Sequence, residues 1–158
     1  MMKYIPSSRR GCITFGLLLL LGLLQAVPRG PRNAGVNGGA NSIGQGYGLP
    51  SGVAMVLKKA CYDCHSNRTS YPWYSRVQPV AQYLDGHVRD GKSELNLDEF
   101  MTYSLRKRQH KLVSIREQVE EGQMPLSSYT WMHPEARLTP EERRLIAEWA
   151  RQQETKGE

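Results

Sequence analysis

The run Cys61-Tyr62-Asp63-Cys64-His65 contains the only two cysteines that lie close together in the chain, followed directly by a histidine. Two thiols separated by two residues can add across the two vinyl groups of one haem, and the adjacent imidazole can then bind its iron. The spacing therefore predicts one covalently attached haem c, with Cys61 and Cys64 as attachment points and His65 as the proximal iron ligand.

Two other kinds of site also use a close cysteine pair. A thioredoxin-like redox pair needs a strand–helix–strand setting, and no convincing alternating strand pattern occurs in the sequence. A structural zinc site needs two further ligands at suitable spacing, whereas the remaining histidines (His87, His110 and His133) show no paired spacing. We therefore prefer haem over zinc, a redox pair or a bare disulfide.

The second axial position of the iron decides between electron transfer and ligand chemistry. A methionine there gives a high reduction potential, whereas an open position admits gases or peroxide. Met124 follows Gly122 and precedes Pro125, so it lies on a constrained loop from which a thioether can be aimed inward. We expect Met124 to be this ligand, although methionine also fills cores, and His133 is the next candidate.

Residues 1–27 indicate export. Basic residues precede an uncharged apolar stretch, Gly11 to Val27, which contains five consecutive leucines. This is the layout of a secretory signal or of an uncleaved signal anchor, and its length is at the short end of a bilayer span. Because no clean cleavage site follows, we expect an uncleaved transmembrane helix. In either case the remaining chain lies on the periplasmic side, tethered to the inner membrane or free in the periplasm.

The rest of the chain divides into a linker and one domain. Residues 28–50 are rich in Gly, Asn and Pro and lack apolar periodicity, so we expect a flexible linker. Residues 51–158 form the predicted haem-binding domain, whose helices are expected over 52–60, 80–89, 105–121 and from 140 onward, with a short one through 103 and an irregular connector over 123–138. The class is all-α.

Two helix ends carry clear signals. Thr139 and Glu142 have the spacing of a capping box around Pro140, which predicts the start of the last helix. Gly122 is suited to end the helix before it.

The charge distribution argues against a nucleic-acid partner. The formal net charge is +6, but five basic residues lie in the first 32 positions. The rest of the chain contains the other 16 of the 21 Lys and Arg and all 15 Asp and Glu, so its charge is nearly balanced. A nearly neutral domain does not fit nucleic-acid binding. A local basic cluster remains from Arg106 to Lys111, which is more simply a solvated helix face than a docking patch for an acidic partner.

Beyond these local patterns, the chain resembles a family of bacterial haem-binding domains related to monohaem cytochromes c, from Val53 to Trp149. The resemblance rests on these segments: 61–67 (CYDCHSN), Thr69, 71–74 (YPWY), Pro79, 87–91, 95–96, 122–126 (GQMPL), Tyr129 and 133–139 (HPEARLT). It implies a cytochrome c-like fold whose first and last helices cross beside the haem, bringing Val53, Val56 and Leu57 against Leu145, Ile146 and Trp149. It also supports Cys61, Cys64, His65 and Met124 as the haem-binding residues.

The aromatic run after the motif is expected to lie near the porphyrin. Tyr71 and Trp73 belong to a run of aromatic residues that is unusually dense for a loop. Aromatic side chains near a haem mostly pack on its face or edge. We expect packing rather than a specific role in electron entry.

Together these patterns predict an exported, monomeric electron carrier rather than an enzyme, whose iron is ligated by His65 and Met124 and which exchanges electrons with a redox partner protein. The alternative is a haem enzyme or a sensor of gas or peroxide with an open distal site. No distal pair of arginine and histidine is identifiable from the sequence, so this alternative ranks second.

Overall fold

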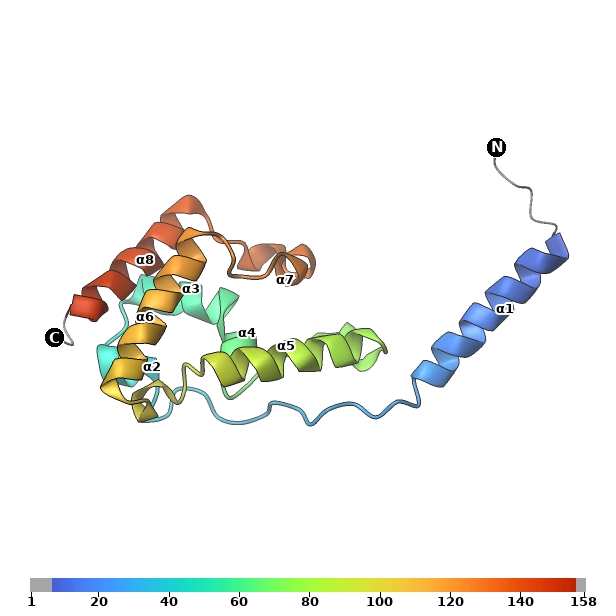
Figure 1. Ribbon diagram of the computed structural model, residues 1–158, viewed down its shortest axis with the longest axis horizontal. Coiled ribbons are helices and arrows are strands. Elements are labelled where there is room, and N and C mark those ends of the chain that lie inside the picture. Colours follow the sequence, from blue (N-terminus) through green and yellow to red (C-terminus); the bar gives the residue numbers. More distant parts are fainter. Residues whose placement is uncertain (1–6, 156–158) are drawn as a thin grey trace. The chain divides into compact units, whose positions relative to one another are not determined.

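The computed structural model describes residues 7–155, and their regular structure is helical (Figure 1). Within that range the only strand-like pairing is an isolated bridge between Ala34 and Arg68, so the predicted all-α class is confirmed. The elements in chain order are α1 (Ser7–Leu24), α2 (Ile43–Tyr47), α3 (Ser51–Ala60), α4 (Tyr62–His65), η1 (Trp73–Arg76), α5 (Val80–Glu94), η2 (Phe100–Thr102), α6 (Leu105–Glu120), α7 (Ser127–Met132), η3 (Pro134–Ala136) and α8 (Pro140–Thr155), where η marks a 3-10 helix.

The chain forms two compact units. The first consists of residues up to Arg32 together with Tyr71–Gly86, and the second of Asn33–Ser70 together with the residues from His87 onward. Helix α5 contributes to both. The motif residues Cys61, Cys64 and His65 belong to the second unit, as does Met124.

Hydrogen bonds between distant segments hold the first unit together. The Gln25 side chain donates to the Gln78 carbonyl (3.2 Å) and accepts from the Gln78 backbone N–H (3.0 Å). The Gly30 N–H donates to Asp85 Oδ2 (3.0 Å). These contacts attach the residues that follow α1 to the segment after η1 and to the first half of α5.

The predicted transmembrane helix is not confirmed. No helix among residues 7–155 is both long enough and apolar enough to cross a membrane. The uncharged part of α1 runs only from Gly11 to Leu24, which is shorter than the roughly 20 residues that a bilayer span requires. The basic residue Lys3 of the predicted export signal lies outside the described residues.

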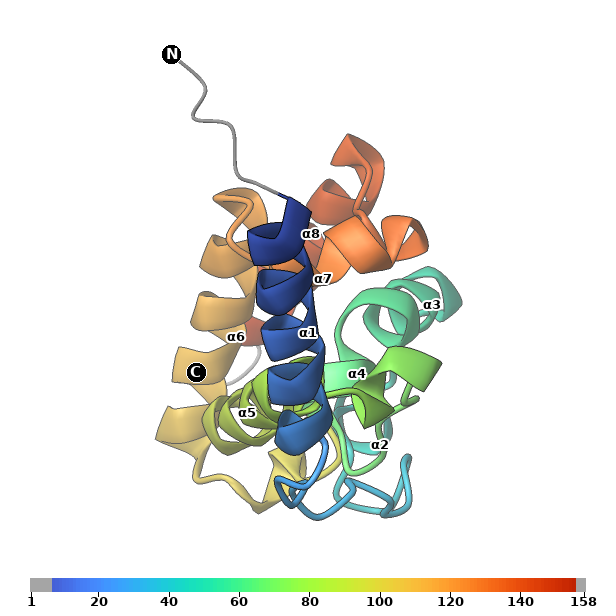
Figure 2. The same ribbon diagram turned by 90° about the vertical axis from the view of Figure 1, so that its right-hand side faces the viewer.

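The core of the second unit lies between α3, α6 and α8. Helix α6 packs along α8, and α3 packs against α8 (Figures 1 and 2), which confirms contact between the domain's first and last predicted helices. The buried faces are those predicted from helical spacing: Val53, Val56, Leu57 and Ala60 on α3, and Leu112, Ile115 and Val119 on α6. On α8, Ile146 and Trp149 are buried, but Leu145 is 38% exposed. Leu145 lies at the margin of the helix contact, beside Gly52.

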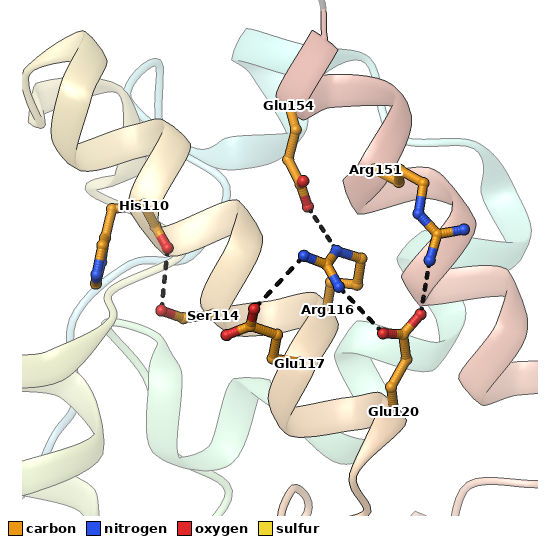
Figure 3. A network of polar contacts seen from close by, with 7 residues as sticks. All are labelled: His110, Ser114, Arg116, Glu117, Glu120, Arg151 and Glu154. Carbon is orange, nitrogen blue, oxygen red and sulfur yellow. Dashed lines mark hydrogen bonds and ion pairs between the residues drawn. The ribbon is translucent and has the colours of Figure 1, made fainter.

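A polar network stabilises the edge of this helix pair (Figure 3). Arg116 on α6 donates from Nε to Glu154 on α8 (3.0 Å) and from Nη1 to Glu120 (3.2 Å). Glu120 in turn accepts from Arg151 of α8 (2.9 Å). The network therefore links α6 to α8 through charged groups outside the apolar core.

Both predicted helix-end signals are confirmed. The Thr139 hydroxyl accepts from the Glu142 N–H (3.2 Å), and the Glu142 carboxylate accepts from the Thr139 N–H (2.9 Å), which completes the capping box. Gly122 follows α6 with a φ of 72°, a left-handed conformation that suits glycine. Helix α5 continues to Glu94, beyond the predicted end, and the connector predicted to be irregular contains α7 and η3.

The segment predicted to be a flexible linker is partly folded. Residues from Asn33 onward belong to the second unit, and Ile43 of α2 is fully buried, with its N–H donating to the Leu97 carbonyl (2.8 Å). Earlier in the segment, the Gly35 N–H donates to the Asn67 carbonyl (2.8 Å). The folded unit thus begins well before residue 51, because non-local hydrogen bonds and one isoleucine order a segment that has no apolar period of its own.

Candidate haem site

One helical turn carries the three motif residues. The Cys61 N–H continues the ladder of α3 by donating to Leu57 O (2.9 Å), and the His65 N–H donates to Cys61 O (2.9 Å). Cys61 and Cys64 are half-buried free thiols. The end of α3 and the short helix α4 therefore hold both thiols and the imidazole within five consecutive residues, as the spacing predicts.

The orientation of the His65 ring leaves one nitrogen available for a metal. Its Nδ1 lies 3.0 Å from the Leu95 carbonyl, and a carbonyl accepts only from a protonated Nδ1. Nε2 is then the unprotonated atom that can bind iron, in the arrangement usual for metal-binding histidines. Burial lowers the pKa of His65. Backbone hydrogen bonds with Leu95 and Gly91 each raise this pKa by less than burial lowers it, and the nearby Lys111 charge lowers it further. The neutral imidazole required for ligation is thus favoured.

A glycine allows α5 to approach the motif closely. A Cβ atom at Gly91 would lie 3.1 Å from both Cβ and the carbonyl oxygen of Cys64, and 3.4 Å from Cε1 of His65. These separations are at or inside ordinary van der Waals contact. The second half of α5 therefore packs directly against the motif, and the next residues of the chain provide the carbonyl that orients His65.

The environment of the thiols disfavours a redox or zinc site. Burial, followed by the charge of Cys64, raises the pKa of Cys61 to about 12, and burial followed by Asp63 raises that of Cys64 to about 11. Catalytic redox cysteines need a lowered pKa. In the described range 7–155, no group of three His, Cys, Asp or Glu side chains is arranged to hold a metal ion. The donor set instead fits a haem c, with two neutral thiols and one oriented imidazole.

Met124 lies in the segment between α6 and α7. Its N–H donates to the Gln118 carbonyl (3.0 Å), which attaches its backbone to the last turns of α6, and the residue is half-buried. Its role as an iron ligand remains a prediction. The other candidate, His133, has its ring stacked on Tyr129 (4.4 Å between centroids) and Nδ1 3.1 Å from Glu135. These contacts hold His133 against its own segment, and ligation by His133 remains the alternative prediction to ligation by Met124.

The two predicted aromatic residues belong to the first unit, in contrast to the motif. The Arg32 guanidinium lies over the Tyr71 ring, 4.1 Å from its centroid. Trp73 is 78% exposed and meets the Tyr74 ring edge-on at 5.8 Å. Haem packing by Tyr71 and Trp73 remains a prediction.

Several residues that support the motif were not predicted individually. Asp98 is 2% exposed, and its carboxylate accepts from the Asn67 N–H (2.7 Å) and the Gly38 N–H (2.8 Å). The Leu97 N–H donates to the His65 carbonyl (2.8 Å). Segments 33–38 and 95–98 thereby hold the chain directly after the motif. One sequence signal could have found this residue, because an aspartate such as Asp98 is a common helix start and precedes the end of the short helix predicted through residue 103.

Asp63, between the two cysteines, also has an unpredicted partner. One carboxylate oxygen accepts from the Tyr129 hydroxyl (2.8 Å), and the other accepts from the Ser70 N–H (3.0 Å). The Asp63 carbonyl accepts from the Thr69 hydroxyl (2.6 Å). The motif is thus connected to α7, the helix that follows Met124.

Comparison with known proteins gives one match. A family model described as a haem-binding domain matches residues 19–152, which is most of the chain. No curated protein and no solved structure gives a significant match.

Proposed function

Because the chain belongs to the haem-binding domain family, we propose that it is an exported protein with one haem c, which transfers electrons through an iron ligated by His65 and Met124. The observation that carries this proposal is the hydrogen bond from His65 Nδ1 to the Leu95 carbonyl, because it makes Nε2 the ring nitrogen that can bind iron, in the residue directly after Cys64. Two thiols and one oriented imidazole within five residues support the proposal.

The side chains have distinct roles in this proposal. Cys61 and Cys64 hold the haem through thioether bonds, and the bound haem supplies the one-electron Fe(III)/Fe(II) couple. His65 binds the iron, while the Leu95 carbonyl fixes its tautomer and increases its basicity. Met124 contributes a thioether, which favours the reduced state and raises the potential. The site therefore tunes a potential and excludes water rather than moving protons.

A redox partner with an acidic docking face is part of the proposal. The first half of α6 carries four Lys and Arg and no acid, and Arg106, Lys107 and His110 border an open hollow of about 280 Å³. Basic residues in the first turn of a helix oppose the helix dipole, so Arg106 and Lys107 do not stabilise α6 through it. Lys111 in the same cluster lies close enough to lower the pKa of His65. An acidic partner docked there would lie near His65.

The deciding experiment measures haem attachment on the full chain expressed with export to the periplasm. A pyridine haemochrome spectrum and an intact mass should show one haem per chain, and the double variant Cys61→Ala/Cys64→Ala should show none. Cys12→Ala is the matched control, because Cys12 lies in α1 and should leave the haem content unchanged. An unmodified mass for the wild-type chain would refute the proposal.

Distal ligation needs a separate test. Methionine-ligated ferric haem has a weak far-red charge-transfer band, which we expect in the wild type and expect to be lost in Met124→Ala. The iron should bind carbon monoxide slowly in the wild type and rapidly in the variant. A high-spin wild-type spectrum with rapid carbon monoxide binding would instead support the alternative, a haem enzyme or sensor with an open distal site.

A further inference from the structure

The hydrogen bond between Tyr129 and Asp63 joins two segments with different roles. Asp63 lies inside the haem-attachment motif, and Tyr129 lies on α7, five positions after Met124. The Tyr129 hydroxyl donates to Asp63 Oδ2 at 2.8 Å, although 66 positions separate the residues in the chain. The bond therefore connects the proximal motif to the segment that carries the proposed distal ligand.

Both partners are held in place by other contacts. Asp63 also accepts from the Ser70 N–H, and its carbonyl accepts from the Thr69 hydroxyl, so its carboxylate is not free to follow a moving tyrosine. The Tyr129 ring stacks on His133 with an angle of 24° between the rings. Stacking on one side and a charged acceptor at the hydroxyl together determine where this ring lies.

The segment around Tyr129 has a defined relation to Met124. The Met124 N–H is bonded to Gln118 at the end of α6, and the Tyr129 N–H is bonded to the Leu126 carbonyl in the first turn of α7. Met124 is thus attached to α6 on one side and, through α7 and Tyr129, to the motif on the other. The carboxylate is a stronger acceptor than a neutral group would be, which strengthens the second attachment.

We propose that Tyr129 and Asp63 are a positioning pair, which sets the distance between the Met124 loop and the haem attached at the motif. The inference rests on the proposed ligation by Met124. Neither Tyr129 nor Asp63 is proposed to bind the iron. Tyr129 acts by keeping α7 on Asp63, so that the thioether of Met124 would stay within reach of an iron held by His65.

The test replaces the hydroxyl of Tyr129 in the haem-loaded full chain. In Tyr129→Phe, we expect a weaker far-red band and tighter binding of added imidazole to the ferric protein, by about tenfold if a charge-assisted hydrogen bond is lost. Asp63→Asn keeps an oxygen acceptor for the hydroxyl and should produce a smaller change. Tyr47→Phe is the matched control, because the Tyr47 ring is half-buried and packs edge-on against Phe100; it should behave as wild type.

The outcomes separate this inference from the proposed function. If the wild type lacks the far-red band, the Met124 assignment fails, and the positioning role fails with it. If the wild type has the band and Tyr129→Phe matches the wild type in band intensity and imidazole affinity, only the positioning role is refuted. Should Tyr129→Phe load no haem, Asp63→Ala decides, because it removes the acceptor of the Tyr129 hydroxyl, and an unchanged imidazole affinity there refutes the pair.

Discussion

The close approach of α5 to the haem motif makes the two glycines of this helix an informative pair. A Cβ at Gly91 would press on Cys64 and His65, whereas a Cβ at Gly86 would meet nothing within 4 Å. Both positions lie inside the same helix, where alanine is intrinsically favoured over glycine by about 0.5–1 kcal/mol. The same substitution should therefore have opposite effects at the two positions.

At Gly91, a Cβ would meet three atoms, of which the two at 3.1 Å would have to give way. Two belong to Cys64, namely its backbone carbonyl oxygen and its Cβ, and the third belongs to the His65 ring, which Leu95 holds. Adding a methyl group to such a packed position costs about 1–3 kcal/mol. After subtraction of the helix gain, Gly91→Ala should lower the free energy of unfolding by up to about 2.5 kcal/mol. Gly86→Ala should raise it by about 0.5–1 kcal/mol.

Guanidinium unfolding of the haem-loaded protein, followed by circular dichroism, measures both changes. The midpoint potential gives a second readout, because a displaced His65 should alter it in Gly91→Ala and not in Gly86→Ala. If Gly91→Ala were as stabilising as Gly86→Ala and left the potential unchanged, then α5 would not contact the motif as described, and the positioning of His65 through Leu95 would lose its support.

Three other predictions concern charge. Asp98→Ala removes the acceptor of two backbone N–H groups next to the motif, so the free energy of unfolding should fall by about 3 kcal/mol, measured by denaturant titration; a loss within error would contradict the Asp98 contacts. Lys59 and the Thr139 N–H lower the pKa of Glu142, so the ionised Glu142 should stabilise the fold above about pH 4.5, and this stabilisation should disappear as the pH falls through the lower folded-state pKa. In thermal melts recorded across pH, Glu142→Gln should lose this pH dependence of stability. Parallel curves for the variant and the wild type would refute the role of Glu142. Replacing Arg106 and Lys107 by Gln should slow the reduction of the haem-loaded protein by the ferrocyanide anion several-fold at low salt but not at high salt. A reduction rate that does not depend on salt in stopped flow would exclude a role for this basic surface.

The helices that form the core of the second unit were predictable because their signals are local. An amphipathic period places Val56, Leu112 and Ile146 on buried faces whatever surrounds them. The capping box at Thr139 depends on residues three positions apart. Such features involve neighbours within one or two turns, so they can be inferred from the order of residues alone.

The departures from prediction have a common physical cause. The folded part of residues 33–50 owes its order to bonds with distant backbone, such as that from Ile43 to Leu97, and no apolar period announces it. Leu145 has the spacing of a buried residue, yet the crossing of α3 and α8 leaves it at the margin. Helix packing and loop docking decide these positions, and neither is encoded within a short window of sequence.

For the haem site, the sequence by itself determined which atoms are present: two thiols and an imidazole within one turn. Only the tertiary structure decided how they are supported. The carbonyl that orients His65 is 30 positions away and the hydroxyl bound to Asp63 is 66 positions away. Hydrogen-bond partners at such separations are chosen by the fold, since chain entropy opposes each pairing until packing brings the segments together.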